Sequence, residues 1–124
     1  MYRSYTEMPV WKKSHQLSVE VFHLTEDLPR SEDYGLTSQI RRSFNSIPEN
    51  IAEGSGRNIK KDKSKFDIIA RGSLYETQNH LIYGNAVGYF ENQITKRLLN
   101  EYNKLAFDLN KLTHSLFQSS QPQP

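Results

Sequence analysis

Cysteine is absent from this 124-residue chain, so neither disulfide bonds nor thiolate metal sites can form. Long apolar runs are missing as well, and because nowhere do roughly 18 apolar residues follow one another, we expect no membrane span. The N-terminal residues lack the continuous apolar segment of a signal peptide. These absences suit a reducing compartment, and they lead us to expect a cytoplasmic protein.

Sequence patterns of catalysis are also scarce. The four histidines, His15, His23, His80 and His114, show no HExxH arrangement and no pairing at a spacing of four. No nucleophile elbow, phosphate-binding loop or dinucleotide fingerprint occurs, and the glycine pair at 54–56 is more typical of the end of a helix. We therefore expect no enzyme activity, no metal and no cofactor.

Helical periodicity is the main positive signal, because alternation of strand length is hard to find. The first segment lies between Pro9 and Pro29, and the second runs from Leu36 to Ile51 with Pro48 inside it. Pro48 cannot donate a hydrogen bond to the carbonyl group four residues earlier. Since the apolar register continues past it, we predict a kinked but continuous helix.

Two further segments complete the pattern. A basic connection over 57–65 leads to a third helix that should start near Ser64 and weaken toward Gly88. A turn at 90–93, with Asn92 as a candidate N-cap, precedes the fourth helix. Toward the core of the third helix we place Phe66, Ile69, Ala70, Ser73, Thr77, Leu81 and Val87, and in the fourth Ile94, Leu98, Tyr102, Leu105, Leu109, Leu112 and Leu116.

Four helices of similar length with short connections predict an all-α fold, an up-down-up-down antiparallel four-helix bundle over residues 1–118. The polar tail 119–124 should be disordered. The side chains expected to be largely buried are Trp11, Phe22, Phe44, Ile47, Leu81, Leu105 and Leu109. Some apolar residues exceed what a bundle seam needs and are candidates for subunit contacts: Trp11, Phe22, Leu99, Tyr102 and Phe117.

Polar residues next to Pro48 form a distinct motif. Asn50, Glu53 and Arg57 are three or four residues apart and share one helix face. The favoured interpretation is structural, in which these groups satisfy the carbonyl that Pro48 frees and the helix end. The alternative is a polar patch for a ligand or a neighbouring subunit. Glu76 has a similar structural interpretation, because Ser73 and His80 flank it by one turn.

Positive charge gathers in the middle of the chain. Residues 41–71 hold eight basic and four acidic residues, a net of +4 in a chain of net charge +2. The candidate nucleic-acid-binding residues are Arg41, Arg42, Arg57, Lys60, Lys61, Lys63, Lys65 and Arg71. Arg41 and Arg42 adjoin core positions, so the segment 57–65 is the stronger candidate; the alternative is a solvated basic loop.

Several segments together resemble a known family. The stretches VWKKSHQLSVEVFHLTEDLP (10–29), YGLTSQIRRSFNSIPENIAEGSGR (34–57), KKDKSKF (60–66) and ARGSLYE (70–76) are similar to four-helix-bundle proteins encoded in intervening sequences of bacterial 23S rRNA genes. The resemblance covers roughly residues 8–118. It implies a left-handed up-down bundle, a ring-like homopentamer, and distant kinship with the accessory proteins of diversity-generating retroelements, which bind nucleic acid through a positive surface.

Two functions from different classes follow. The first is a non-enzymatic homo-oligomer, pentamer favoured, that binds RNA or DNA through its basic surface. The second is a homo-oligomeric scaffold or adaptor for a protein partner such as a reverse transcriptase. Steep salt dependence of binding to nucleic acid would distinguish the first from the second.

Overall fold

The computed structural model describes the backbone of residues 2–120 and the side chains of residues 2–116, and every regular element in this part is helical. Four α-helices make up most of it: α1 (Pro9–Thr25), α2 (Leu36–Ser55), α3 (Lys60–Ala86) and α4 (Asn92–Ser120). Two short 3-10 helices accompany them, η1 (Tyr5–Glu7) before α1 and η2 (Arg30–Glu32) before α2. The predicted all-α four-helix fold is confirmed.

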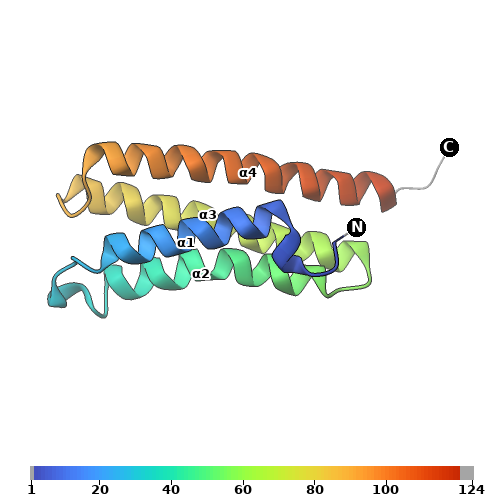
Figure 1. Ribbon diagram of the computed structural model, residues 1–124, viewed down its shortest axis with the longest axis horizontal. Coiled ribbons are helices and arrows are strands. Elements are labelled where there is room, and N and C mark those ends of the chain that lie inside the picture. Colours follow the sequence, from blue (N-terminus) through green and yellow to red (C-terminus); the bar gives the residue numbers. More distant parts are fainter. Residues whose placement is uncertain (1, 121–124) are drawn as a thin grey trace.

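The helices lie side by side as a bundle, and the chain reverses direction at each connection (Figure 1). One end of the bundle holds η1 and the α2–α3 connection at 56–59; we call it the basic end. The other holds η2 and the α3–α4 connection at 87–91; we call it the Phe90 end. The contact between α2 and α3 is the most extensive of the bundle, and that between α1 and α4 is the least extensive.

The core confirms most of the predicted burial. Each helix contributes apolar side chains to one continuous cluster: Leu17, Val21, Leu36, Ile40, Phe44, Ile47, Ile51, Ala70, Leu74, Leu81, Phe90, Leu98, Tyr102, Leu105, Ala106 and Leu109. Trp11 is only half-buried, and the prediction for Phe22 is wrong because its ring is 38% exposed. Phe22 lies at the edge of α1, where the guanidinium group of Arg41 covers its ring at 4.5 Å.

The face of α3 that packs against the bundle matches the predicted one only in part: Ala70, Thr77 and Leu81 are buried as expected. Ile69 and Val87 are exposed, whereas Leu74 is fully buried and Asp67 is nearly so. Small and polar residues line much of the inner face, and therefore the apolar pattern pointed to the neighbouring face. In α4 the prediction for Ile94 is wrong in the same way, because Thr95 takes the inner position.

Pro48 lies inside α2 without ending it, so the predicted continuous helix is confirmed. The carbonyl group of Phe44, which has no amide donor at Pro48, accepts a hydrogen bond from the Ser18 hydroxyl of α1 at 3.1 Å. The freed backbone group is thus satisfied by a neighbouring helix. The prediction that the polar motif after Pro48 supplies this donor is wrong.

Element boundaries differ in two places. α3 begins at Lys60, and Ser64 lies within it, donating to the Lys61 carbonyl at 2.9 Å. α4 is capped by Glu91, whose carboxylate accepts from the backbone of Gln93 and Ile94 at 3.1 and 3.3 Å, so the expected Asn92 cap is wrong. The backbone of residues 119 and 120 continues α4, while residues 121–124 of the predicted disordered tail lie outside the described part, as does the side chain of Phe117.

Candidate nucleic-acid interface

The α2–α3 connection is short and tightly packed. Beyond Ser55 the amide of Arg57 donates to the Gly54 carbonyl at 3.1 Å, and the Lys63 ammonium donates to the Ser55 carbonyl at 3.3 Å. A Cβ atom on Gly54 would lie 3.0 Å from the Cβ atom of Phe66, so glycine permits the close approach of α2 to α3. This packing holds the first turns of α3 beside the end of α2.

Five basic residues gather there, and we call them the basic turn: Arg57, Lys60, Lys61, Lys63 and Lys65. With Asp62 as the single acid between 57 and 65, five minus one gives a local net charge of +4. The side chains of Lys61 and Lys65 are exposed and make no ion pair within the described residues. Because residues 60–65 belong to α3, the basic connection predicted over 57–65 is largely a helix.

Arg57 is partly committed within the subunit. Its guanidinium group pairs with Glu53 at 2.7 Å, one turn earlier, and lies 4.8 Å from the centre of the Phe66 ring. Both partners are exposed enough that the pair contributes little to stability. The ion pair mainly holds the guanidinium group of Arg57 in one position.

The other candidate basic residues do not join the basic turn. Arg41 donates to the Thr25 hydroxyl at 3.0 Å, and Arg71 donates to Asn110 of α4 at 2.7 Å. Arg42 is exposed, but it precedes Arg57 by fifteen residues, or about 22 Å along helical backbone. The structure therefore divides the predicted set, and only the segment 57–65 forms a compact basic surface.

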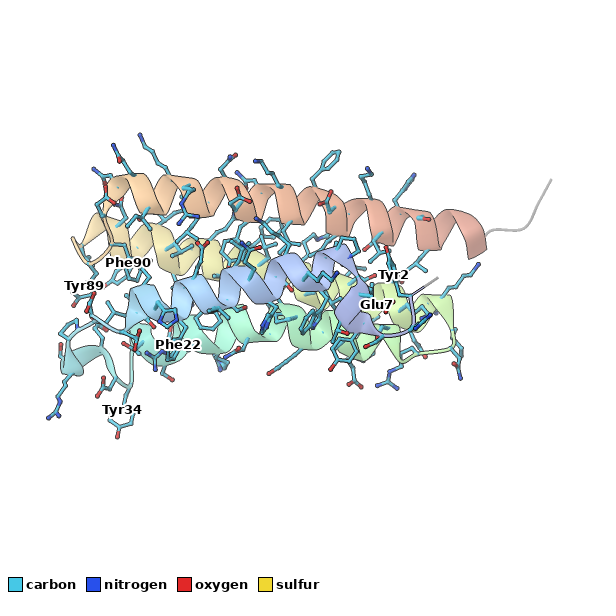
Figure 2. All side chains as sticks on the ribbon, in the orientation of Figure 1. Tyr2, Glu7, Phe22, Tyr34, Tyr89 and Phe90 are labelled. Carbon is cyan, nitrogen blue, oxygen red and sulfur yellow. The ribbon has the colours of Figure 1, made fainter. Side chains whose placement is uncertain are left out.

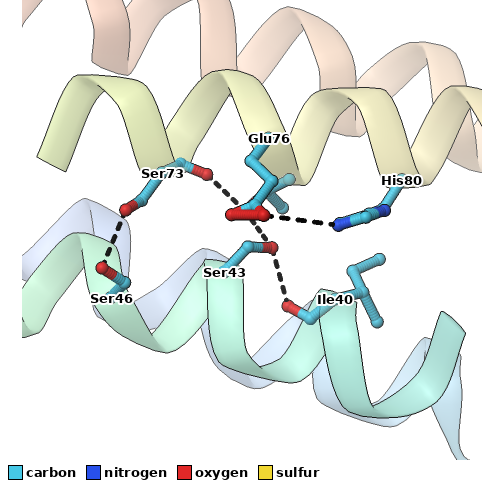
Figure 3. Close-up of polar contacts among 7 residues, drawn as sticks. Ile40, Ser43, Ser46, Ser73, Glu76 and His80 are labelled. Carbon is cyan, nitrogen blue, oxygen red and sulfur yellow. Dashed lines mark hydrogen bonds and ion pairs between the residues drawn. The ribbon is translucent and has the colours of Figure 1, made fainter. Parts of the chain in front are cut away.

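The polar motif after Pro48 joins α2 to α3. The amide of Asn50 donates to both the carbonyl and the hydroxyl oxygen of Ser46, at 2.7 and 2.9 Å. The Ser46 hydroxyl in turn accepts from Ser73 of α3 at 2.7 Å, as Figure 3 shows. Asn50 thus helps to hold a contact between helices, while Glu53 belongs to the ion pair with Arg57.

Glu76 and His80 face each other one turn apart on α3 (Figure 3). The closest approach of carboxylate and imidazole is 4.0 Å, too long for a hydrogen bond. Burial lowers the pKa of His80, and the charge of Glu76 acts in the opposite direction. Ser73 bonds to Ser46 rather than to Glu76, so Ser73, Glu76 and His80 do not form one hydrogen-bonded row on α3.

A cavity of about 660 Å³ opens beside the basic turn, and no sequence pattern predicted it. It lies between the N-terminal segment, the end of α2, the start of α3 and the last turns of α4. Asp67 lines it and is only 5% exposed. Burial raises the pKa of this carboxyl from 3.8 to about 6, and the charge of Lys63 acts in the opposite direction.

The sequence model of the 23S rRNA-intervening sequence protein family matches residues 6–111. The chain belongs to this family. The resemblance seen in residues 10–76 is therefore confirmed, and the basic turn and the cavity are features of a 23S rRNA-intervening sequence protein. No curated protein matches the sequence.

A solved structure shows the same fold. A protein of unknown function from the S23 ribosomal protein family of Bacteroides thetaiotaomicron superposes on this 23S rRNA-intervening sequence protein with a TM-score of 0.74. The match covers 84% of this chain and 97% of that chain at 20% sequence identity. At this identity the likeness establishes the fold alone.

Within the described residues, no three histidine, aspartate or glutamate side chains gather closely enough to hold a metal ion. None of the described helices combines the length and apolar character needed to cross a membrane.

Proposed function

We propose that this 23S rRNA-intervening sequence protein is a non-enzymatic, homo-oligomeric cytoplasmic protein that binds RNA or DNA through phosphate contacts made by the basic turn. The observation that carries the proposal is the net charge of +4 over residues 57–65, presented at one end of the bundle on the rigid first turns of α3. Lysine contacts to phosphates release counterions, so affinity should fall steeply with salt and depend little on sequence.

An outward stripe on α3 supports the oligomer. Ile68, Tyr75 and Ile82 recur every seven residues and are 40%, 48% and 53% exposed. Gly72 lies between them with no neighbouring atom within 4 Å of an added Cβ atom. Such a heptad stripe on a solvent-facing helix suits packing against a second helix. Together with the family resemblance it favours a homopentamer, in which the basic turn is repeated around a ring.

Two lysines make the sharpest test of nucleic-acid binding. Replacing Lys61 and Lys65 by Gln removes two exposed charges of the basic turn and leaves the contacts of Lys63 intact. Binding of a single-stranded RNA, measured by fluorescence anisotropy over a salt series, should weaken, and the salt slope should fall by about 1–2. The matched control replaces exposed Arg30 and Lys96 at the Phe90 end by Gln, and it should leave the slope unchanged.

The molecular mass in solution tests whether the stripe on α3 is an interface between subunits. Light scattering at micromolar concentration should give a multiple of 14.5 kDa for the parent and 14.5 kDa for a variant with Tyr75→Glu and Ile82→Glu. Phe107→Glu is the control, because Phe107 is 64% exposed on α4 and lies outside the stripe. A stable oligomer that binds neither RNA nor DNA at about 50 mM salt would favour the scaffold for a protein partner.

A further inference from the structure

The cavity at the basic end has the size and walls of a small-molecule site. Its volume of about 660 Å³ falls within the roughly 300–1,000 Å³ typical of such sites. Met8, Ile51 and Leu112 give it apolar walls. A second hollow of about 400 Å³ shares Met8 and Leu112 with it, so the space continues along α4.

Asp67 is a polar group of this cavity for which the fold shows no structural role. No hydrogen bond reaches its carboxyl group from the described residues, and its oxygens are not among the fully buried atoms but border the cavity, although the residue as a whole is only 5% exposed. The ammonium group of Lys63, one turn earlier, acts on Asp67 through its charge but donates its hydrogen bond to Ser55. Ionising a nearly buried carboxyl group that no protein donor contacts is costly, and such groups concentrate at ligand-binding sites.

Aromatic and basic side chains stand at the mouth of the same cavity. Tyr2 and Tyr5 line it and are 55% and 40% exposed, and the Tyr5 ring packs edge to face against the Trp11 ring at 5.4 Å. Arg3 and Lys63 also line it, and Lys63 belongs to the basic turn. These groups suit the parts of a nucleotide. The nearly buried acceptor suits the edge of a base, the exposed rings suit its face, and the cations near the rim suit its phosphate.

We propose that this cavity binds a guanine base, with the two oxygens of Asp67 accepting its N1–H and N2–H groups and a tyrosine ring stacking on its face. It specifies which base the nucleic-acid interface binds, and it therefore rests on the function proposed above. Phosphates on either side of the base would lie on Lys63 and the rest of the basic turn.

Guanine is the base whose donors fit a carboxylate. An ionised carboxyl group only accepts hydrogen bonds, and guanine offers two adjacent N–H donors that match its two oxygens. Adenine and cytosine each place an acceptor nitrogen beside their amino group, and uracil places carbonyl oxygens on both sides of its N–H group. Each of these would bring an acceptor against Asp67, so they should bind less well.

The experiment compares short uridine strands that differ in one central nucleotide. With guanosine at the centre, fluorescence anisotropy should show binding about tenfold tighter than with uridine or adenosine. Inosine lacks the N2 amino group and should lose most of this gain, whereas 7-deazaguanosine keeps both donors and should retain it. Equal affinity for all five strands would overturn the guanine site and leave the phosphate contacts standing.

The matched variants are Asp67→Asn and Asp62→Asn. Each removes one negative charge from the first turns of α3. Asp67→Asn should abolish the guanosine preference and leave affinity for the all-uridine strand within about twofold. Asp62→Asn should keep the preference. A preference that survives Asp67→Asn would overturn the proposal.

Guanosine monophosphate separates this inference from the proposed function. Binding of the mononucleotide, detected by amide shifts at Gly54 and Asp67 in NMR spectra, without binding of any strand would support a nucleotide site and overturn the nucleic-acid interface. Failure of both the mononucleotide and the strands to bind would overturn both proposals.

Discussion

At the Phe90 end, the ring of Phe90 fills the space between the helices and is 3% exposed, whereas the basic end holds a cavity lined by the carboxyl group of Asp67. Two polar side chains at the Phe90 end have partners, because Asn85 donates to the Phe90 carbonyl and Tyr89 to the Glu32 carboxylate, both at 2.9 Å, whereas the buried hydroxyl of Thr37 has none among the described residues. Figure 2 shows Tyr89 and Phe90 together at that end, with Tyr2 at the other. The two ends thus differ in packing: a buried aromatic ring closes one end, while the other holds an open cavity with a nearly buried carboxyl group in its wall.

Removing one apolar side chain from each end should expose this difference most clearly. Phe90→Ala should lower the free energy of unfolding by about 3–5 kcal/mol, because it empties a closely packed site. Leu112→Ala should cost only about 1–2 kcal/mol, because Leu112 is half-buried beside an existing cavity. Urea denaturation followed by circular dichroism measures both, and equal losses would show that the two ends are packed alike.

The charge of Asp67 should give the next largest effect. In the folded protein its carboxyl has a pKa of about 6, raised by burial from 3.8, so the folded state binds the proton more tightly than the unfolded state does. Above pH 6 the ionised, buried group lowers stability, and this penalty disappears as the pH falls toward 4. Asp67→Asn should therefore raise the free energy of unfolding by about 1–3 kcal/mol at pH 8 and change it little near pH 3.

Asp62→Asn serves as the control for that pH profile. Asp62 lies in the first turn of α3, where a negative charge favours the helix N-terminus, so its loss should slightly lower stability at neutral pH. Thermal unfolding between pH 3 and pH 8 compares the two variants. An Asp67→Asn variant that is less stable than the parent at pH 8 would mean that the ionised carboxylate has a stabilising partner.

Glycines at the two ends should respond differently to an added methyl group. A Cβ atom on Gly84 would lie 2.3 Å from the Phe90 ring, so Gly84→Ala should cost about 1–2 kcal/mol by forcing that ring aside. At Gly56 the nearest atom, the Glu53 carbonyl oxygen, is 3.6 Å away and the φ angle is −83°, so alanine fits. Chemical denaturation of Gly56→Ala should show a change within about 0.5 kcal/mol.

The smallest effect concerns the exposed hydrogen bond at the Phe90 end. The bond to Glu32 raises the pKa of Tyr89 above its ordinary value of 10.0. Glu32→Gln removes the negative charge that disfavours the phenolate, so the Tyr89 pKa should fall back toward that value. NMR of the tyrosine Cζ carbons over alkaline pH follows this group separately, and a pKa that does not change would show that the bond is absent in solution.

The sequence predicted the buried face of a helix well where that face is apolar and poorly where it is polar. In α4, Leu98, Leu105 and Leu109 repeat with helical spacing and are all buried as predicted. In α3 the buried face includes Ser64 and Asp67, whose polarity gives no apolar signal. The close contact with α2 selects small and hydrogen-bonding side chains there, and periodicity of hydrophobic residues cannot reveal such a face.

The candidate interface was predicted only where it is local in sequence. The run 57–65 became one basic surface because neighbouring residues on a short connection stay together in space. Arg41 and Arg71 were separated from it by their contacts with Thr25 and Asn110 on other helices. The cavity depends on the N-terminal segment returning against the ends of three helices, and such an arrangement leaves no pattern within any one segment.

The hydrogen bond from Ser18 to the Phe44 carbonyl has a consequence for how α1 and α2 align. Pro48 cannot supply the amide donor that this carbonyl would take in a regular helix, and the Ser18 hydroxyl of α1 donates to it instead. Sliding α1 by a single residue would move the Ser18 hydroxyl by about 1.5 Å and break the bond, so Pro48 makes one axial position of α1 better than its neighbours. Proline usually breaks helices, but Pro48 here helps to set the axial alignment of α1 against α2.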